Sequence, residues 1–121
     1  MSITATTPSR MDRYTDNPTL HQTGTYYVQA AQYAHDDSLN YLAKKALPDV
    51  EDHLAEFYAT TVDEPWHNMI ADELTMAAHD AETLRTLANV TNHAEVRRTL
   101  DGIGGYLTTA ARIADRAGVA L

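Results

Sequence analysis

The chain has 121 residues, 44% of them hydrophobic, which fits one domain with one core. It contains no cysteine, which excludes disulfide bonds and thiolate metal sites. A formal net charge of −8 without a basic stripe argues against nucleic acid as a partner, and no apolar run approaches the roughly 20 residues that cross a bilayer. We therefore expect a soluble, cytoplasmic protein that binds neither nucleic acid nor membrane.

The N-terminal segment differs in composition from the rest of the chain. Its first 18 residues are rich in threonine, serine and proline and show no hydrophobic period. This composition predicts an extended N-terminal arm over residues 1–18, followed by a helical bundle over residues 19–121.

The first helix is expected over about residues 19–46, where apolar side chains recur every three or four positions. Its buried stripe would consist of Val28, Ala31, His35, Leu39, Leu42 and Ala46. Pro48 interrupts this pattern and fits the first turn of a short second helix. That helix would bury Val50, Leu54 and either Phe57 or Tyr58.

The third helix is expected from Pro65 to about Val90, with Asp63 or Glu64 as its cap. Its apolar face would consist of Trp66, Ile70, Leu74, Ala77, Ala81, Leu84 and Ala88. The fourth helix is expected from about residue 93 to residue 117, with Thr91 or Asn92 as its cap.

Three glycines lie inside this fourth helix, in the segment LDGIGGYLTT. The apolar positions keep the same phase on both sides of them, at Val96, Leu100, Ile103, Leu107, Ala110, Ala114 and Ala117. A break in the helix would shift that phase, so we predict one continuous helix. Gly102, Gly105 and Thr109 then share one side, and their small size would let another backbone approach closely.

Taken together, the pattern predicts an all-α fold. We expect an antiparallel four-helix bundle with three long helices and one short helix, preceded by the extended arm. Short connections between the helices favour antiparallel neighbours.

A second apolar stripe is expected on the first helix, opposite its buried stripe. It comprises Tyr26, Tyr33 and Tyr41, with Ala30 between them. A surface helix needs only one apolar side, and tyrosine suits contact surfaces because its ring buries area while its hydroxyl stays wet. We therefore predict an interface formed by Tyr26, Tyr33 and Tyr41 together with Gly102, Gly105 and Thr109.

The sequence carries no catalytic signature. Its three serines lie outside any nucleophile motif, and no glycine-rich phosphate loop follows a strand. Histidine and glutamate recur at helical spacing in three pairs, namely His53 with Glu56, His79 with Glu82 and Glu64 with His67. His79 would face solvent and not the interior of the bundle, so we expect no metal site. Since the catalytic and phosphate-binding motifs are also missing, we expect no catalytic residue and no cofactor.

An acidic block separates the two halves of the chain, with ten acids and no lysine or arginine from Asp49 to Glu82. Asp49, Asp52 and Glu56 would align on the second helix and Asp72 and Glu82 on the third, as one ridge for a basic partner.

The leading hypothesis for the function is a non-enzymatic homo-oligomer or assembly component acting through protein–protein contacts. The alternatives are a small acidic inhibitor or immunity-type protein and, second, a His/carboxylate metal-binding helical protein.

Overall fold

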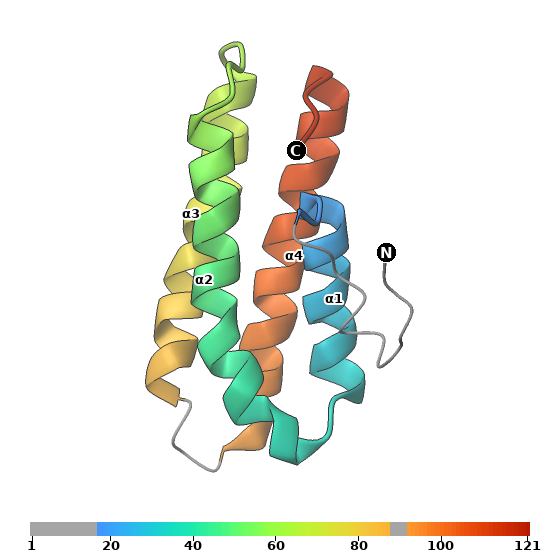
Figure 1. Cartoon of the computed structure of the whole chain (residues 1–121), viewed down its shortest axis with the longest axis vertical. Helices are drawn as coiled ribbons and strands as arrows, with labels where there is room; N and C mark the ends of the chain where they lie inside the picture. The colour runs from blue at the N-terminus through green and yellow to red at the C-terminus, as the bar shows by residue number, and fades with distance from the viewer. Residues whose placement is uncertain (1–16, 88–91) are drawn as a thin grey trace.

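The computed structural model describes residues 17–87 and 92–121, and within these it is all α-helical (Figure 1). The helices are α1 (Leu20–Tyr33), α2 (Leu39–Tyr58), α3 (Trp66–Leu87) and α4 (His93–Ala117), and a short 3₁₀ turn, η3 (Asp36–Ser38), precedes α2. Residues 1–16, which hold most of the predicted arm, lie outside the described residues.

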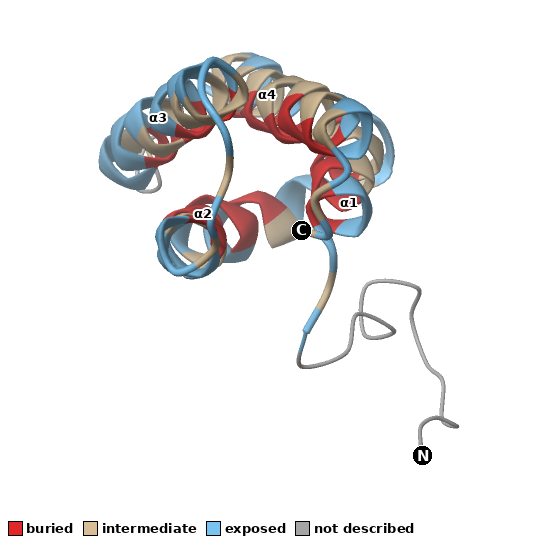
Figure 2. Ribbon diagram, turned by 90° about the horizontal axis from the view of Figure 1, so that it is seen from above, coloured by how far each residue is buried: buried red, intermediate tan, exposed pale blue. Residues whose placement is uncertain are grey.

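The four helices pack as a bundle around one apolar core. α4 is the central helix because it packs against both α1 and α3, and α3 also packs against α2. Figure 2 shows α1, α4 and α3 as an arc, with α2 facing it and the buried sides turned inward. The largest fully buried side chains come from all four helices: Tyr27, Phe57, Leu20, Leu39, Leu42, Ile70, Leu74, Leu84, Leu100, Ile103, Leu107 and Val50.

The predicted fourth helix is confirmed as one continuous element. α4 runs from His93 to Ala117 through all three glycines, and the Asn92 side chain caps it by accepting a hydrogen bond from the Glu95 N–H at 3.1 Å. Gly118 ends it with φ of 75°, a left-handed conformation that glycine adopts without strain.

The predicted boundary between the first two helices is wrong. The first helix ends at Tyr33, 13 residues before its expected end, so α1 with 14 residues is the short helix and α2 has 20. Pro48 lies inside α2 on its exposed side instead of starting a helix. His35, expected in the buried stripe, is exposed and precedes the 3₁₀ turn.

The end of α1 is held by a side chain from α4. The Arg97 guanidinium donates to the carbonyls of Ala31 at 3.2 Å and Ala34 at 2.8 Å and to the Asp36 carboxylate at 2.7 Å. The last carbonyls of a helix have no partner within it, so these bonds stabilise the termination. The same guanidinium lowers the pKa of Asp36 below its ordinary value.

α1 and α4 are in close contact at two glycines, Gly24 and Gly104. A Cβ placed on Gly24 would lie 2.6 Å from Thr108 Cγ2 and 3.0 Å from the Gly104 carbonyl oxygen. A Cβ on Gly104 would lie 2.7 Å from both the Gly24 carbonyl oxygen and the Val28 nitrogen. Within the chain, the backbones of α1 and α4 therefore come close at Gly24 and Gly104, which are not the positions predicted for a close approach, Gly102 and Gly105.

Candidate interaction surface

The predicted tyrosine stripe does not form a single surface. Tyr26 and Tyr33 are on α1 but Tyr41 is on α2, because the first helix ends early. Tyr26 is only 4% exposed, whereas Tyr33 and Tyr41 are 75% and 62% exposed. The prediction that Tyr26 belongs to an outward-facing stripe is therefore wrong, since other helices of the same chain cover it.

A polar layer between α1 and α2 explains the position of Tyr26. Its ring lies under the Lys45 ammonium, 5.1 Å from Nζ to the ring centroid, and edge-on to Tyr27. The Tyr27 hydroxyl donates to Asp49 Oδ2 at 2.6 Å, and Lys45 Nζ donates to the same oxygen at 2.6 Å. Burial, followed by the negative charge of Asp49, raises the pKa of Tyr27 above its ordinary value.

The same layer contains a buried histidine. His53 Nε2 lies 2.8 Å from the Thr23 hydroxyl, and both side chains are buried. Burial lowers the pKa of His53, although Glu56, Asp49 and Asp52 oppose the shift. α1 and α2 make few direct backbone contacts, so these polar side chains join them. Each of these polar side chains has a partner within the chain.

The predicted small-residue positions lie on the side of α4 away from the core. The space around a Cβ on Gly105 is open to 4 Å, and a Cβ on Gly102 would meet only the Asp80 carboxylate at 3.2 Å. Thr109 is half-buried. Gly105 is therefore open to a partner, Gly102 lies against Asp80 of α3, and the role of all three positions in an interface stays a prediction.

The predicted acidic face is only partly available. Asp49 is engaged by Lys45 and Tyr27, and Glu82 is paired with Arg85. Asp52, Glu56 and Asp72 are exposed.

No group of three or more metal-ligating side chains occurs among the described residues. Among the predicted pairs, His53 Nδ1 lies 3.9 Å from Glu56 Oε1, and His67 Nδ1 lies 3.8 Å from Glu64 Oε2.

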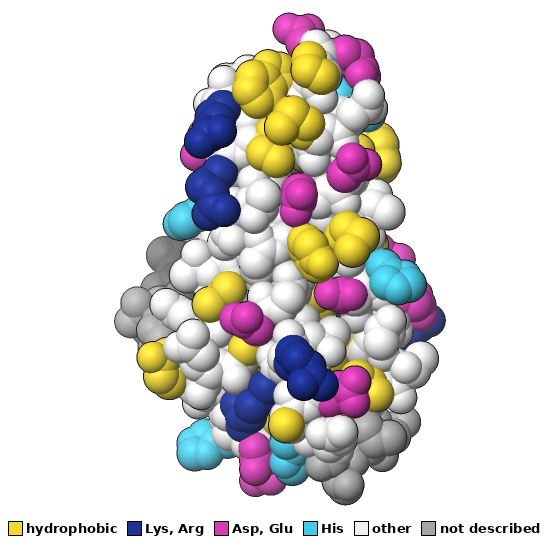
Figure 3. All heavy atoms as spheres, turned by 180° about the vertical axis from the view of Figure 1, so that it is seen from behind, with side chains coloured by type: hydrophobic (Ala, Val, Ile, Leu, Met, Phe, Trp, Pro, Cys, Tyr) yellow, Lys and Arg dark blue, Asp and Glu magenta, His cyan; other side chains and the backbone are white. Residues whose placement is uncertain are grey.

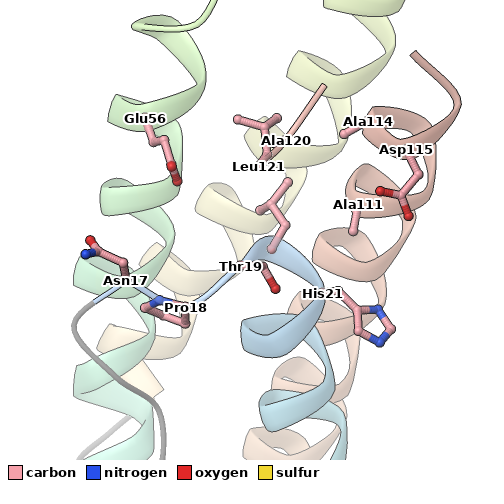
Figure 4. A pocket seen from close by; sticks show the side chains of 11 residues that line it. Asn17, Pro18, Thr19, His21, Glu56, Ala111, Ala114, Asp115, Ala120 and Leu121 are labelled. Carbon is pink, nitrogen blue, oxygen red and sulfur yellow. The ribbon is translucent and has the colours of Figure 1, made fainter. Parts of the chain in front are cut away.

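A pocket of about 390 Å³ lies where the start of α1 meets the ends of α2 and α4 (Figure 4). Its walls include Leu20, Ala111 and Leu121, with the carboxylates of Glu56 and Asp115 at the sides. The Thr19 hydroxyl in its lining accepts a hydrogen bond from the Gln22 N–H at 3.1 Å and caps α1.

The outer side of the α3–α4 pair carries apolar side chains that the sequence reasoning did not single out. Met69 and Met76 on α3 are 45% and 44% exposed, and Tyr106 and Ile113 on α4 are half-buried. We call these four residues the α3–α4 apolar patch. Its signal in the sequence is a seven-residue spacing on both helices, which places both members of each pair on one side.

No protein-family model, curated protein or solved structure matches this chain. Within the described residues, no helix is both long enough and apolar enough to cross a bilayer.

Proposed function

We propose that this protein acts through protein–protein contacts, as a homo-oligomer or a structural component of an assembly, and not as an enzyme. The observation that carries the proposal is the α3–α4 apolar patch, in which Met69 and Met76 keep nearly half of their surface exposed. Contiguous apolar surface with a polar rim is typical of protein–protein contact sites. Methionine and tyrosine are among the residue types enriched in such sites.

The proposal includes an antiparallel order of neighbouring helices. The contact of Gly24 with Thr108 and the bonds of Ala34 with Arg97 support this order for α1 and α4, because higher numbers on one helix meet lower numbers on the other. The short connection between Leu87 and His93 supports it for α3 and α4.

A mass measurement in native solution tests the proposal. Light scattering coupled to size-exclusion chromatography, run from low to high micromolar concentration, is expected to show a species heavier than the 13.4 kDa chain, in a proportion that rises with concentration. If the purified protein, with no other protein present, keeps a mass of 13.4 kDa over the whole concentration range, self-association is contradicted.

A second candidate function, binding of a basic protein, is supported by one face of α2. Glu51, Asp52 and Glu56 are exposed there, and no lysine or arginine within the described residues pairs with them. D52N/E56Q removes two of these charges without disturbing Asp49, which supports the fold. Retention of this variant on a cationic polylysine matrix is expected to fall and to depend less steeply on salt, and unchanged retention would refute the idea.

A further inference from the structure

The α3–α4 apolar patch has a regular geometry. Met69 and Met76 are seven residues apart on α3, and Tyr106 and Ile113 are seven residues apart on α4. Seven residues are two helical turns, or about 10 Å of helix length. The same spacing repeats in the apolar seam through which two helices pack in a coiled coil.

The contact between Asp80 and Gly102 fixes how the two pairs lie relative to each other. A Cβ on Gly102 would be 3.2 Å from Asp80 Oδ2, so these residues are opposite each other. In antiparallel helices, a step of four residues back from Asp80 on α3 matches a step of four residues forward from Gly102 on α4, so Met76 lies opposite Tyr106. A further step of seven residues on each helix places Met69 opposite Ile113. The patch therefore consists of two apolar pairs at successive levels.

Charged side chains of opposite sign flank the two pairs. Arg112 and Arg116 are exposed on α4, and Asp72 is exposed on α3. None of the three forms an ion pair with another described residue. Figure 3, which shows this side of the molecule, has hydrophobic side chains down the middle, with Lys and Arg side chains along one edge of the upper half and acidic side chains towards the other edge.

We propose that a second copy of this chain binds here, through a twofold axis that lies in the plane of the face and runs parallel to α3 and α4, between the methionines of α3 and the Tyr106–Ile113 pair of α4. The inference rests on the proposed function of self-association and names its surface. Because this axis runs along the helices, it exchanges the α3 edge and the α4 edge of the face, so Arg112 and Arg116 of one copy meet Asp72 of the other. The open space at Gly105 lets the second copy approach α4 closely. A surface of this kind is complementary to itself, which selects a second copy as its occupant.

The first test removes the apolar contacts. M69Q/M76Q keeps side-chain length and helix propensity, and both positions are exposed, so the monomer is expected to fold with an unchanged circular dichroism spectrum. The dimer loses four methionine contacts, and sedimentation equilibrium is expected to show a dissociation constant raised by about 100-fold. Y33Q/Y41Q, which alters two other exposed aromatic residues, is the matched control and is expected to leave the constant unchanged.

The second test exchanges the charges. D72R and R112E/R116E are each expected to weaken association by about tenfold, because every substituted contact occurs twice and becomes repulsive. The combined variant D72R/R112E/R116E restores opposite charges across the axis and is expected to recover most of the affinity. Recovery in the combined variant is a result that a merely destabilising effect of the substitutions would not give.

The outcomes separate this inference from the proposed function. A wild-type protein that is monomeric at every concentration overturns both. A wild-type dimer that M69Q/M76Q leaves intact, or that Y33Q/Y41Q disrupts instead, overturns the assigned surface and leaves self-association standing. A combined charge variant as weak as its parents overturns the twofold arrangement.

Discussion

Replacing Gly104 by alanine is expected to destabilise the protein although alanine is the better helix former. The added Cβ would lie 2.6 Å from Val28 Cγ2 and 2.7 Å from two backbone atoms of α1, the Gly24 oxygen and the Val28 nitrogen. A side chain can rotate away from such a contact, but the backbone of a packed helix moves only as a unit. α1 must therefore separate from α4 along its length.

The expected magnitude follows from two opposing effects. Overpacking of a core costs about 1–3 kcal/mol, and the backbone contacts at Gly104 place this substitution at the upper end, near about 3 kcal/mol. Replacing a helical glycine by alanine returns about 1 kcal/mol of helix propensity. The free energy of unfolding of G104A should therefore fall by about 2 kcal/mol, which for a chain of this length lowers the melting temperature by about 8 °C.

Gly105 provides the matched control because it is the next residue in the same helix and the space around its Cβ is open to 4 Å. G105A is expected to raise the free energy of unfolding by about 1 kcal/mol. Urea unfolding followed by circular dichroism, at protein concentrations low enough that association adds nothing, measures both variants. The packing argument is refuted if G104A is as stable as the wild type, or if the two variants change stability in the same direction.

Two further predictions concern the polar layer between α1 and α2. The pKa of His53 is lower in the folded protein than in the unfolded chain, so at falling pH the unfolded chain binds the proton first. The free energy of unfolding therefore falls as the pH drops below about 6.5, the ordinary pKa of histidine. Between pH 7.5 and pH 5 the urea midpoint should fall less in H53Q than in the wild type, and an equal fall in both proteins would contradict this cause. Y27F removes the hydroxyl that donates a hydrogen bond to Asp49. Losing one hydrogen bond to a partly buried carboxylate should lower the free energy of unfolding by about 1–2 kcal/mol at pH 7. A urea midpoint in Y27F equal to that of the wild type would disprove this prediction.

The helices that could be predicted from the sequence are those whose apolar phase continues without interruption. In α4 the steps from Leu100 to Ile103 and on to Leu107 carry the buried face past the glycines, and the structure confirms the continuous helix. The same reasoning holds at Pro48, where the buried residues Ala46 and Val50 are four positions apart. Proline on the exposed side of a helix removes one hydrogen bond without disturbing that phase, so its presence was a poor guide to the boundary.

The end of α1 could not be predicted in the same way, because its cause is not local. The carbonyls of Ala31 and Ala34 are satisfied by Arg97, which is more than 60 positions further along the chain. The only local signal is the segment Asp36–Ser38, whose residue types favour turns. Early termination then placed Tyr26 and Tyr41 on different helices and removed the predicted tyrosine stripe.

The candidate surface was half visible in the sequence. The spacing of Met69 from Met76 and of Tyr106 from Ile113 can be read from residue numbers alone. The contact between Asp80 and Gly102 determines which methionine of α3 lies opposite which residue of α4, and this register can be obtained only from the structure. Gly102, Gly105 and Thr109 were predicted as a contact surface of α4. Only the structure shows that the neighbouring Gly104 packs against α1 whereas the space beside Gly105 is open.

Crosslinking at the proposed twofold axis tests the central claim most directly. Thr109 lies midway between Tyr106 and Ile113, and the chain has no cysteine of its own, so T109C carries a single thiol beside the axis. A short bis-maleimide is expected to convert T109C into a covalent species of twice the 13.4 kDa chain mass, and to leave Y41C monomeric although position 41 is the more exposed of the two. Equal crosslinking of both variants, or none at T109C, would contradict the account.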